Sequence, residues 1–212
     1  MLSKPTRVAT LAAIAALALS GCAGMGKDEC RAMDWRTVGY EDGATGQGIE
    51  RLTSRRQACA KHGVAPDLDA YLAGRDEGLL EFCRPANGFR VGARGRDYAG
   101  ICPAHLDLPF TDAYQAGRTL WQLETQVRDA TRGIVNRRAQ VEEIDTALLG
   151  IGYTIIGENR TPEERAQALL DTRSLTDRRG RLVAEMEALE RALPGHEAEL
   201  ADYRAWLAEA GY

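Results

Sequence analysis

The stretch CAKHGVAPDLDAYLAGR, residues 59–75, returns at residues 102–118 as CPAHLDLPFTDAYQAGR. Aligned without gaps at an offset of 43, residues 59–81 and 102–124 share 11 identities in 23 positions. Agreement of this extent predicts an internal repeat. A shorter relative begins at Asp34, where DWRTVGYEDG matches DAYLAGRDEG from Asp69 at the aspartate and at both glycines.

Each copy is expected to be a loop that leads into a helix. Asp69 and Asp112 suit the N-cap, because a short acceptor side chain satisfies free backbone N–H groups at a helix start. Pro66 and Pro109 precede them, as expected in the entry to a helix. A glycine inside a helix costs about 1 kcal/mol relative to alanine. Two interpretations of the repeated glycines stay open: they allow close approach of another backbone or ring, or they end short helices.

The cysteines are interpreted as a lipidation site and two disulfides. Cys22 follows a signal-like N-terminus, which leaves an even number of cysteines for an oxidising compartment: Cys30, Cys59, Cys83 and Cys102. Three pairings are possible, and we favour Cys30–Cys59 with Cys83–Cys102, because each closes a short loop around one copy. The alternative is a zinc site, in which Cys59 and Cys102 act with two histidines three residues further on, His62 and His105.

The first residues predict export and anchoring. Lys4 and Arg7 precede an apolar run over residues 8–19, which is too short to span a bilayer. The run ends in LSGC, residues 19–22, and this resembles the lipobox of bacterial lipoproteins. The resemblance implies cleavage before Cys22 and acylation of it. Alanine, not aspartate, follows Cys22, and in such proteins this implies the outer membrane, with the chain facing the periplasm.

Composition separates two regions after the lipobox. The chain as a whole carries a net charge of −4, and the processed chain would carry 25 basic and 31 acidic residues, which argues against a nucleic-acid partner. Residues 119–212 contain no cysteine and no lysine. We therefore expect a mainly α protein with four parts: a signal peptide over residues 1–21, a tether over 22–29, a small glycine-rich, disulfide-bonded domain over 30–118 with short strands or loops, and a long antiparallel helical hairpin over 119–212.

The hairpin is predicted from heptads. Residues 120, 127, 134, 141 and 148 form one column and residues 123, 130, 137, 144 and 151 the other, and nine of the ten are apolar. GIGYTIIGENRTP, residues 150–162, is expected to form the turn, with Thr161 as the N-cap of the next helix. The apolar tip LLGIGYTII, residues 148–156, is expected to be buried. A second helix is expected to end at Pro194-Gly195, and a short third helix follows.

The sequence offers two further candidate sites. Asp42 and Glu77 occupy matched places in two copies, and such a carboxylate pair is the machinery of a glycoside hydrolase. Asn87-Gly88 is a turn signal that could join two short strands. The arginines near it, together with Tyr98, could receive an anionic partner, although a solvated loop is the favoured interpretation: Arg84, Arg90, Arg94 and Arg96.

Several motifs together resemble one family. They are DW…GYEDG, YLAGRDEGL…FC.P, FRVG..G..Y.G.CP and F.DAYQAGR, behind a lipobox. The pattern resembles the proteobacterial lipoproteins known as domain of unknown function 2799, over about residues 22–120. The resemblance implies an envelope lipoprotein and implies no activity.

We therefore expect a non-enzymatic envelope lipoprotein that acts as a structural or interaction module and needs no cofactor. Acyl chains on Cys22 would anchor it in the outer membrane, and a protein or the cell wall would be its partner. The alternatives are a cell-wall hydrolase and a periplasmic metal-binding protein.

Overall fold

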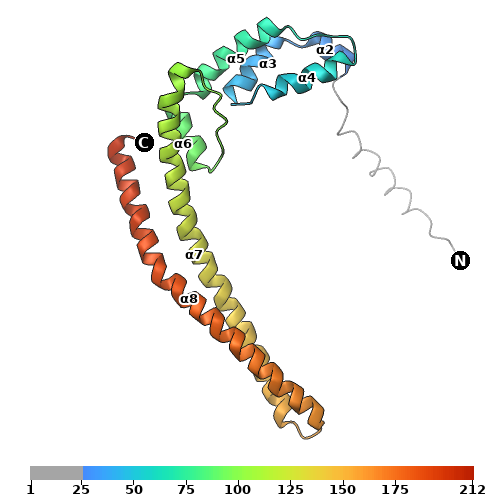
Figure 1. Cartoon of the computed structure of the whole chain (residues 1–212), viewed down its shortest axis with the longest axis vertical. Coiled ribbons are helices and arrows are strands. Elements are labelled where there is room, and N and C mark those ends of the chain that lie inside the picture. Colours follow the sequence, from blue (N-terminus) through green and yellow to red (C-terminus); the bar gives the residue numbers. More distant parts are fainter. Residues whose placement is uncertain (1–25) are drawn as a thin grey trace, which may run out of the picture. The chain divides into compact units, whose positions relative to one another are not determined.

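The computed structural model describes residues 26–212, and it is helical (Figure 1). Over these residues there is no strand, which confirms the mainly α fold class. The short strands that the sequence suggested for the small domain are therefore not formed within residues 26–212. The described helices are α2 (Lys27–Ala32), α3 (Trp35–Ala44), α4 (Glu50–Ala60), α5 (Leu68–Phe82), α6 (Pro85–Ala93), α7 (Ala104–Ile156) and α8 (Pro162–Ala210).

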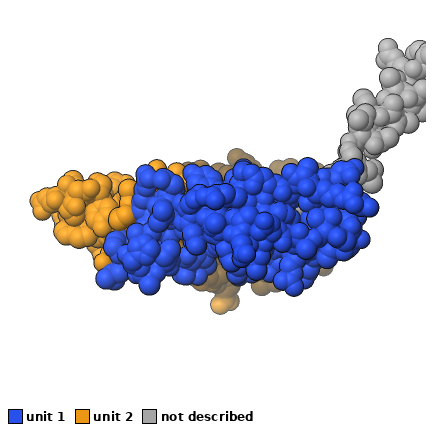
Figure 2. Space-filling model, turned by 90° about the horizontal axis from the view of Figure 1, so that it is seen from above, with its two compact units in different colours: residues 1–84, 99–110 blue, residues 85–98, 111–212 orange. Residues whose placement is uncertain are grey.

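The helices divide into two compact units, which Figure 2 colours separately. Within the described part, the first unit comprises residues 26–84 and 99–110, and the second comprises residues 85–98 and 111–212. The division passes through α7 between Phe110 and Thr111, and α6 belongs to the second unit. The limits expected from the sequence, 30–118 and 119–212, therefore differ from this division.

In the first unit, α3 and α5 cross so closely that only glycine fits between them. A Cβ atom on Gly39 would lie 2.0 Å from the carbonyl oxygen of Tyr71, and one on Gly43 would lie 2.3 Å from that of Arg75. The reverse holds for α5, where a Cβ on Gly78 would lie 2.2 Å from the carbonyl oxygen of Tyr40. Since later residues of α3 meet later residues of α5, the two helices run parallel. The repeated glycines thus permit close backbone approach, which was one of the two interpretations left open.

The second unit repeats this crossing with α6 and α7. A Cβ on Gly92 would lie 2.1 Å from the carbonyl oxygen of Tyr114, and one on Gly117 would lie 2.1 Å from that of Phe89. A left-handed glycine follows each first helix and contacts an aromatic ring, Phe82 for Gly46 and Trp121 for Gly95. These contacts match Gly43 with Gly92 and Gly78 with Gly117.

The structural repeat therefore differs from the sequence repeat by one helical turn. The gapless offset of 43 matched Gly74 with Gly117, whereas the helix crossings give an offset of 39 and match Gly78 with Gly117. The reason lies before the helices. The loop over residues 61–67 precedes α5, but its sequence counterpart, residues 104–110, is the first part of α7. The cysteines thus align at the sequence offset of 43, whereas the glycines at the helix crossings align at the structural offset of 39.

Three local expectations are corrected by these helices. Asp69 lies in the first turn of α5, and the N-cap is Asp67, whose side chain accepts a hydrogen bond from the Ala70 N–H. Asp112 lies inside α7, as does Pro109, because that helix already begins at Ala104. Asn87-Gly88 does not form a hairpin turn. It lies within α6, where Gly88 is buried and where the next glycine, Gly92, packs against the backbone of α7.

The four predicted cysteines form two disulfides. Cys30 pairs with Cys59 and Cys83 pairs with Cys102, which is the pairing favoured from the sequence. Cys30 and Cys59 lie in a cluster with Trp35, Leu52 and Tyr71, so this disulfide is part of the core of the first unit. A small domain gains from such links because they restrict the unfolded chain.

A thiol count tests this framework. In a secreted Cys22→Ala form, we expect no free thiol under denaturing conditions before reduction and four afterwards, because all four remaining cysteines are paired. A thiol-reactive dye in denaturant, with and without prior reductant, makes the measurement. Four free thiols without reductant would contradict the disulfide framework.

In the second unit, α8 runs beside α7 over much of its length as an antiparallel hairpin (Figure 1). The predicted α7 seam is present: Leu123, Ala130, Ile134 and Ile144 are buried, and the remaining seam residues are half-buried. On α8, the complementary seam includes Ala168, Leu200 and Leu207, all of them buried.

Two hairpin expectations are wrong. α8 continues through Pro194-Gly195 to Ala210 and takes up the expected third helix, because proline removes one backbone donor without ending a helix that is held along a partner. The apolar turn segment is helical up to Ile156, and Leu149, Tyr153 and Ile156 are exposed, not buried. These three residues belong to neither of the two heptad columns that form the seam, so their side chains do not pack against α8 through it.

Ion pairs connect the two arms of the hairpin, α7 and α8. Arg137 Nε donates to Glu185 Oε2 at 2.8 Å, and Arg179 Nε donates to Asp145 Oδ1 at 2.6 Å. The hydrogen bond from Arg179 lowers the pKa of Asp145 below its ordinary value of 3.8, against a smaller opposing effect of desolvation.

This pair predicts a pH dependence. Because the folded-state pKa of Asp145 is depressed, its contribution to stability is present above pH 3.8 and is lost as the pH falls through the lower folded-state value. Wild type should therefore melt above Asp145→Asn at pH 7, and the gap between their melting temperatures should close in strong acid. A gap that stays constant from pH 7 to pH 2 would contradict this assignment.

Candidate functional site

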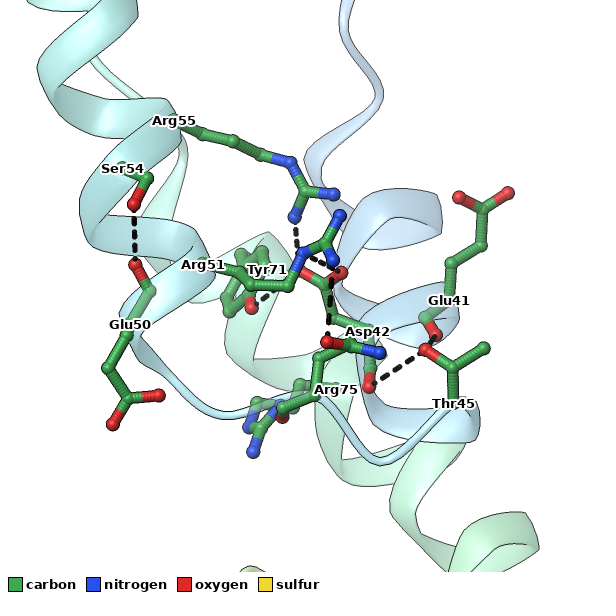
Figure 3. Close-up of polar contacts among 10 residues, drawn as sticks. Glu41, Asp42, Thr45, Glu50, Arg51, Ser54, Arg55, Tyr71 and Arg75 are labelled. Atoms are coloured by element: carbon green, nitrogen blue, oxygen red, sulfur yellow. Dashed lines mark hydrogen bonds and ion pairs between the residues drawn. The ribbon is translucent and has the colours of Figure 1, made fainter. Parts of the chain in front are cut away.

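The most buried polar site in the first unit is centred on Asp42 of α3 (Figure 3). This carboxylate is 3% exposed. Arg55 pairs with its Oδ2 atom, Arg51 Nε lies 3.6 Å from Oδ1, and the Tyr71 hydroxyl donates to Oδ2 at 3.0 Å. Arg75 is also buried, and its Nη1 donates to the Gln47 carbonyl at 2.7 Å. The cluster thus joins α3, α4 and α5.

Tyr71 acts in this cluster as a hydrogen-bond donor. Burial raises the pKa of its phenol above the ordinary value of 10.0, and the hydrogen bond to Asp42 raises that pKa further. The hydroxyl therefore keeps its proton at neutral pH and donates it to the carboxylate. Tyr71 has no exposed surface, so this donor is directed at Asp42 and not at a ligand from solvent.

The carboxylate pair suggested by the sequence consists of two unlike groups. Asp42 is enclosed by donors from two helices. Glu77, its counterpart in α5, has a side chain that is 52% exposed and pairs with Arg36. Each carboxylate is thus bound to arginine, and the geometry gives Asp42 a role in holding three helices together.

Sequence reasoning missed the partners of Asp42. The signal was available: Arg51 and Arg55 are four residues apart, which places both on one face of a helix. Nothing in the sequence indicated which carboxylate that face would meet.

The remaining predicted site residues are separated. Cys22 lies outside the described residues. His62 and His105 are exposed, and the sulfur atoms of Cys59 and Cys102 belong to disulfides. Within residues 26–212, no group of three or more His, Cys, Asp or Glu side chains is arranged to hold a metal ion.

The arginine-rich segment does not form one site. Arg84 pairs with Glu81, and Arg90 Nη2 donates to Asn87 Oδ1 at 3.4 Å. Arg94 and Arg96 are exposed after the end of α6. Tyr98 contacts Tyr114, with ring centroids 5.8 Å apart. Two of the four arginines thus have local partners and the other two are exposed, in line with a solvated surface.

An exposed apolar surface lies near the end of the hairpin. We define the hairpin-end surface by five side chains that are each more than half exposed: Leu149, Tyr153 and Ile156 of α7, with Leu169 and Leu170 of α8. Ile156 and Tyr153 are each 74% exposed. Exposed apolar patches of this kind are uncommon on soluble domains, which makes this surface a candidate interaction site.

Comparison with known proteins gives one match. Residues 34–119 match the family model described as protein of unknown function (DUF2799). No curated protein and no solved structure matches the chain. Over residues 26–212, no helix combines the length and apolar character needed to cross a bilayer. The family match spans α3 to α6 and the beginning of α7, which includes both glycine crossings, and confirms the resemblance that the motifs gave. Residues 34–119 of this chain are thus similar to the family described as protein of unknown function (DUF2799).

Proposed function

We propose that the protein is a non-enzymatic interaction module of the bacterial envelope, anchored in the outer membrane through Cys22 and facing the periplasm. The observation that carries the proposal is the hairpin-end surface, which presents large apolar side chains on a helical hairpin. The lipobox-like LSGC supports the anchor, and the disulfides suit an oxidising compartment.

The proposed partner is a protein. Exposed leucine, isoleucine and tyrosine side chains fit an apolar protein surface and offer few hydrogen bonds to a glycan. The turn beside them, residues 157–164, carries Glu158, Glu163 and Glu164 against Arg160 alone. This acidic turn would be repelled by anionic lipid headgroups, which disfavours a membrane as the occupant.

The alternatives have less support. A glycoside hydrolase would need carboxylates that can reach a sugar and a water molecule, whereas Asp42 is enclosed by Arg51, Arg55 and Tyr71. A zinc site would need thiolates at Cys59 and Cys102, and both sulfur atoms are bonded to other cysteines.

Polar replacement of the hairpin-end surface tests the proposal. The triple variant Leu149→Gln, Tyr153→Gln, Ile156→Gln is expected to lose most of the protein that cross-links to wild type in intact cells, because it removes the apolar contact and leaves the seam intact. Val135→Gln is the matched control, since Val135 is also an exposed apolar residue of α7 and lies outside that surface. Equal cross-linking by wild type and the triple variant would overturn the proposal.

A further inference from the structure

The first unit has a pocket that neither the repeat nor the proposed function uses. It lies between α4, the α4–α5 connection and the start of α5, and its volume is about 530 Å³. This is within the range of small-molecule sites, roughly 300–1,000 Å³. The residues that define its character are Leu52, Arg56, Val64, Ala65, Pro66 and Leu68.

The pocket wall is aliphatic. Apart from Thr53 and Arg56, its side chains are those of alanine, leucine, valine and proline, and no aromatic residue among 26–212 lines it. Leu68, at the first position of α5, is half exposed, so an apolar surface remains open to solvent there. Such a wall suits a flexible hydrocarbon chain better than a sugar or a nucleotide base, which need stacking or several hydrogen bonds.

Among residues 26–212, one cation at this wall has no counter-ion. Two of the three α4 arginines, Arg51 and Arg55, pair with Asp42. Arg56, the third, is exposed, lines the pocket and makes no ion pair with any residue of 26–212. A guanidinium binds a carboxylate with two parallel hydrogen bonds, so the pocket combines an apolar wall with an anion-binding group.

The pocket lies in the segment in which the two copies of the sequence repeat differ in structure. It includes Gly63, Val64, Ala65 and Pro66 of the connection between α4 and α5. The sequence counterpart of this connection is the helical start of α7, residues 104–110. The loop is therefore not required by the helix-pair architecture, which forms without it in the second unit.

We propose that this pocket binds one aliphatic carboxylate, that is, a fatty acid of medium chain length. The chain lies on Leu52, Val64 and Leu68, and the carboxylate binds Arg56. The site is distinct from the hairpin-end surface, and the two can be tested separately.

The test is a titration of the secreted Cys22→Ala protein with decanoate below its micelle concentration, followed by amide NMR. We expect saturable one-to-one binding, with the largest shifts at Ala60, Gly63 and Ala65, and no binding of butyrate. Arg56→Gln should weaken binding about tenfold, since it removes a charged hydrogen-bond partner. Lys61→Gln is the matched control and should bind as wild type does, because Lys61 is exposed, near Arg56 in sequence and absent from the wall.

A second variant separates the chain contact from the charge. Leu68→Gln keeps Arg56 and replaces a half-exposed residue, so it should fold, with both disulfides intact, and should also bind decanoate more weakly. Three results would overturn the proposal: no binding of decanoate, binding that does not saturate and shifts amides throughout the protein, or equal affinity of wild type and Arg56→Gln.

Discussion

Replacing Gly78 with alanine is expected to lower the free energy of unfolding by about 3 kcal/mol, the upper end of what overpacking costs. The added Cβ would lie 2.2 Å from the carbonyl oxygen of Tyr40 and 2.6 Å from the backbone nitrogen of Ala44. Both are backbone atoms of α3, so no side chain can rotate to make room. The helices must separate, and the contacts along their crossing weaken. Chemical denaturation of the secreted Cys22→Ala form, followed by circular dichroism, measures the change.

Gly195→Ala is the control for this prediction. Gly195 lies in α8, and nothing lies within 4 Å of the position its Cβ would take. The same substitution there should raise stability by about 0.5–1 kcal/mol, because alanine is the better helix former. Opposite signs at the two positions would show that packing, and not helix propensity, decides the effect. A neutral or stabilising Gly78→Ala would contradict the close crossing of α3 and α5.

Asp42→Ala should lower the free energy of unfolding by about 3–5 kcal/mol, which is typical when one partner of a buried ion pair is removed. The substitution leaves Arg55 partly buried without its carboxylate, and it leaves the hydroxyl of the fully buried Tyr71 without an acceptor. Circular dichroism at increasing urea concentration provides the measurement. Truncating Tyr71 to phenylalanine in the same background should then cost less than it does in wild type, because the two residues share a hydrogen bond.

Glu77→Ala is the matched control for Asp42→Ala, because Glu77 occupies the equivalent place in α5. Its side chain is 52% exposed and its partner Arg36 is 58% exposed, so the pair is solvated and its loss should cost less than about 1 kcal/mol. Equal losses for the two variants would mean that Asp42 is not the buried centre of this unit.

The sequence predicted what depends on local chemistry and on repetition. Heptad spacing gave the α7 seam, and an even number of cysteines gave two disulfides, paired as expected. Thr161 is an N-cap because its hydroxyl accepts from the Glu164 N–H, which depends only on adjacent residues. These features follow from the order of residue types along a short stretch.

The features that were missed depend on partners distant in the sequence. Asn87-Gly88 has the composition of a turn, but it lies within α6, a helix whose Gly92 packs against the backbone of α7. The repeat alignment from the sequence differs from the structural one by one helical turn. Sequence identity is highest where the cysteines and the DAY…AGR motif recur, whereas helix packing matches Gly78 with Gly117. α8 continues past Pro194 because it packs along the antiparallel helix α7. Helix propensity describes only local preference and does not take this packing into account.

For the candidate sites too, the sequence identified the residues, and contacts with distant residues decided their environment. Asp42 was identified from its place in the repeat, but its burial and its bonds to Arg55 and Tyr71 turn a suspected catalytic acid into a structural centre. The tip of the hairpin, residues 148–156, was recognised as apolar, and the general preference for burial predicted the wrong environment for Leu149, Tyr153 and Ile156.

The central claim, that the end of the hairpin is where a partner binds, is tested most directly by site-specific photo-cross-linking in cells. A photoreactive residue is placed at Ile156 or at Val135, which are aliphatic, 74% and 58% exposed, and three heptads apart at the same heptad position of α7. We predict a discrete protein adduct from Ile156 and none from Val135. The same adducts from both positions, or none from either, would contradict the claim.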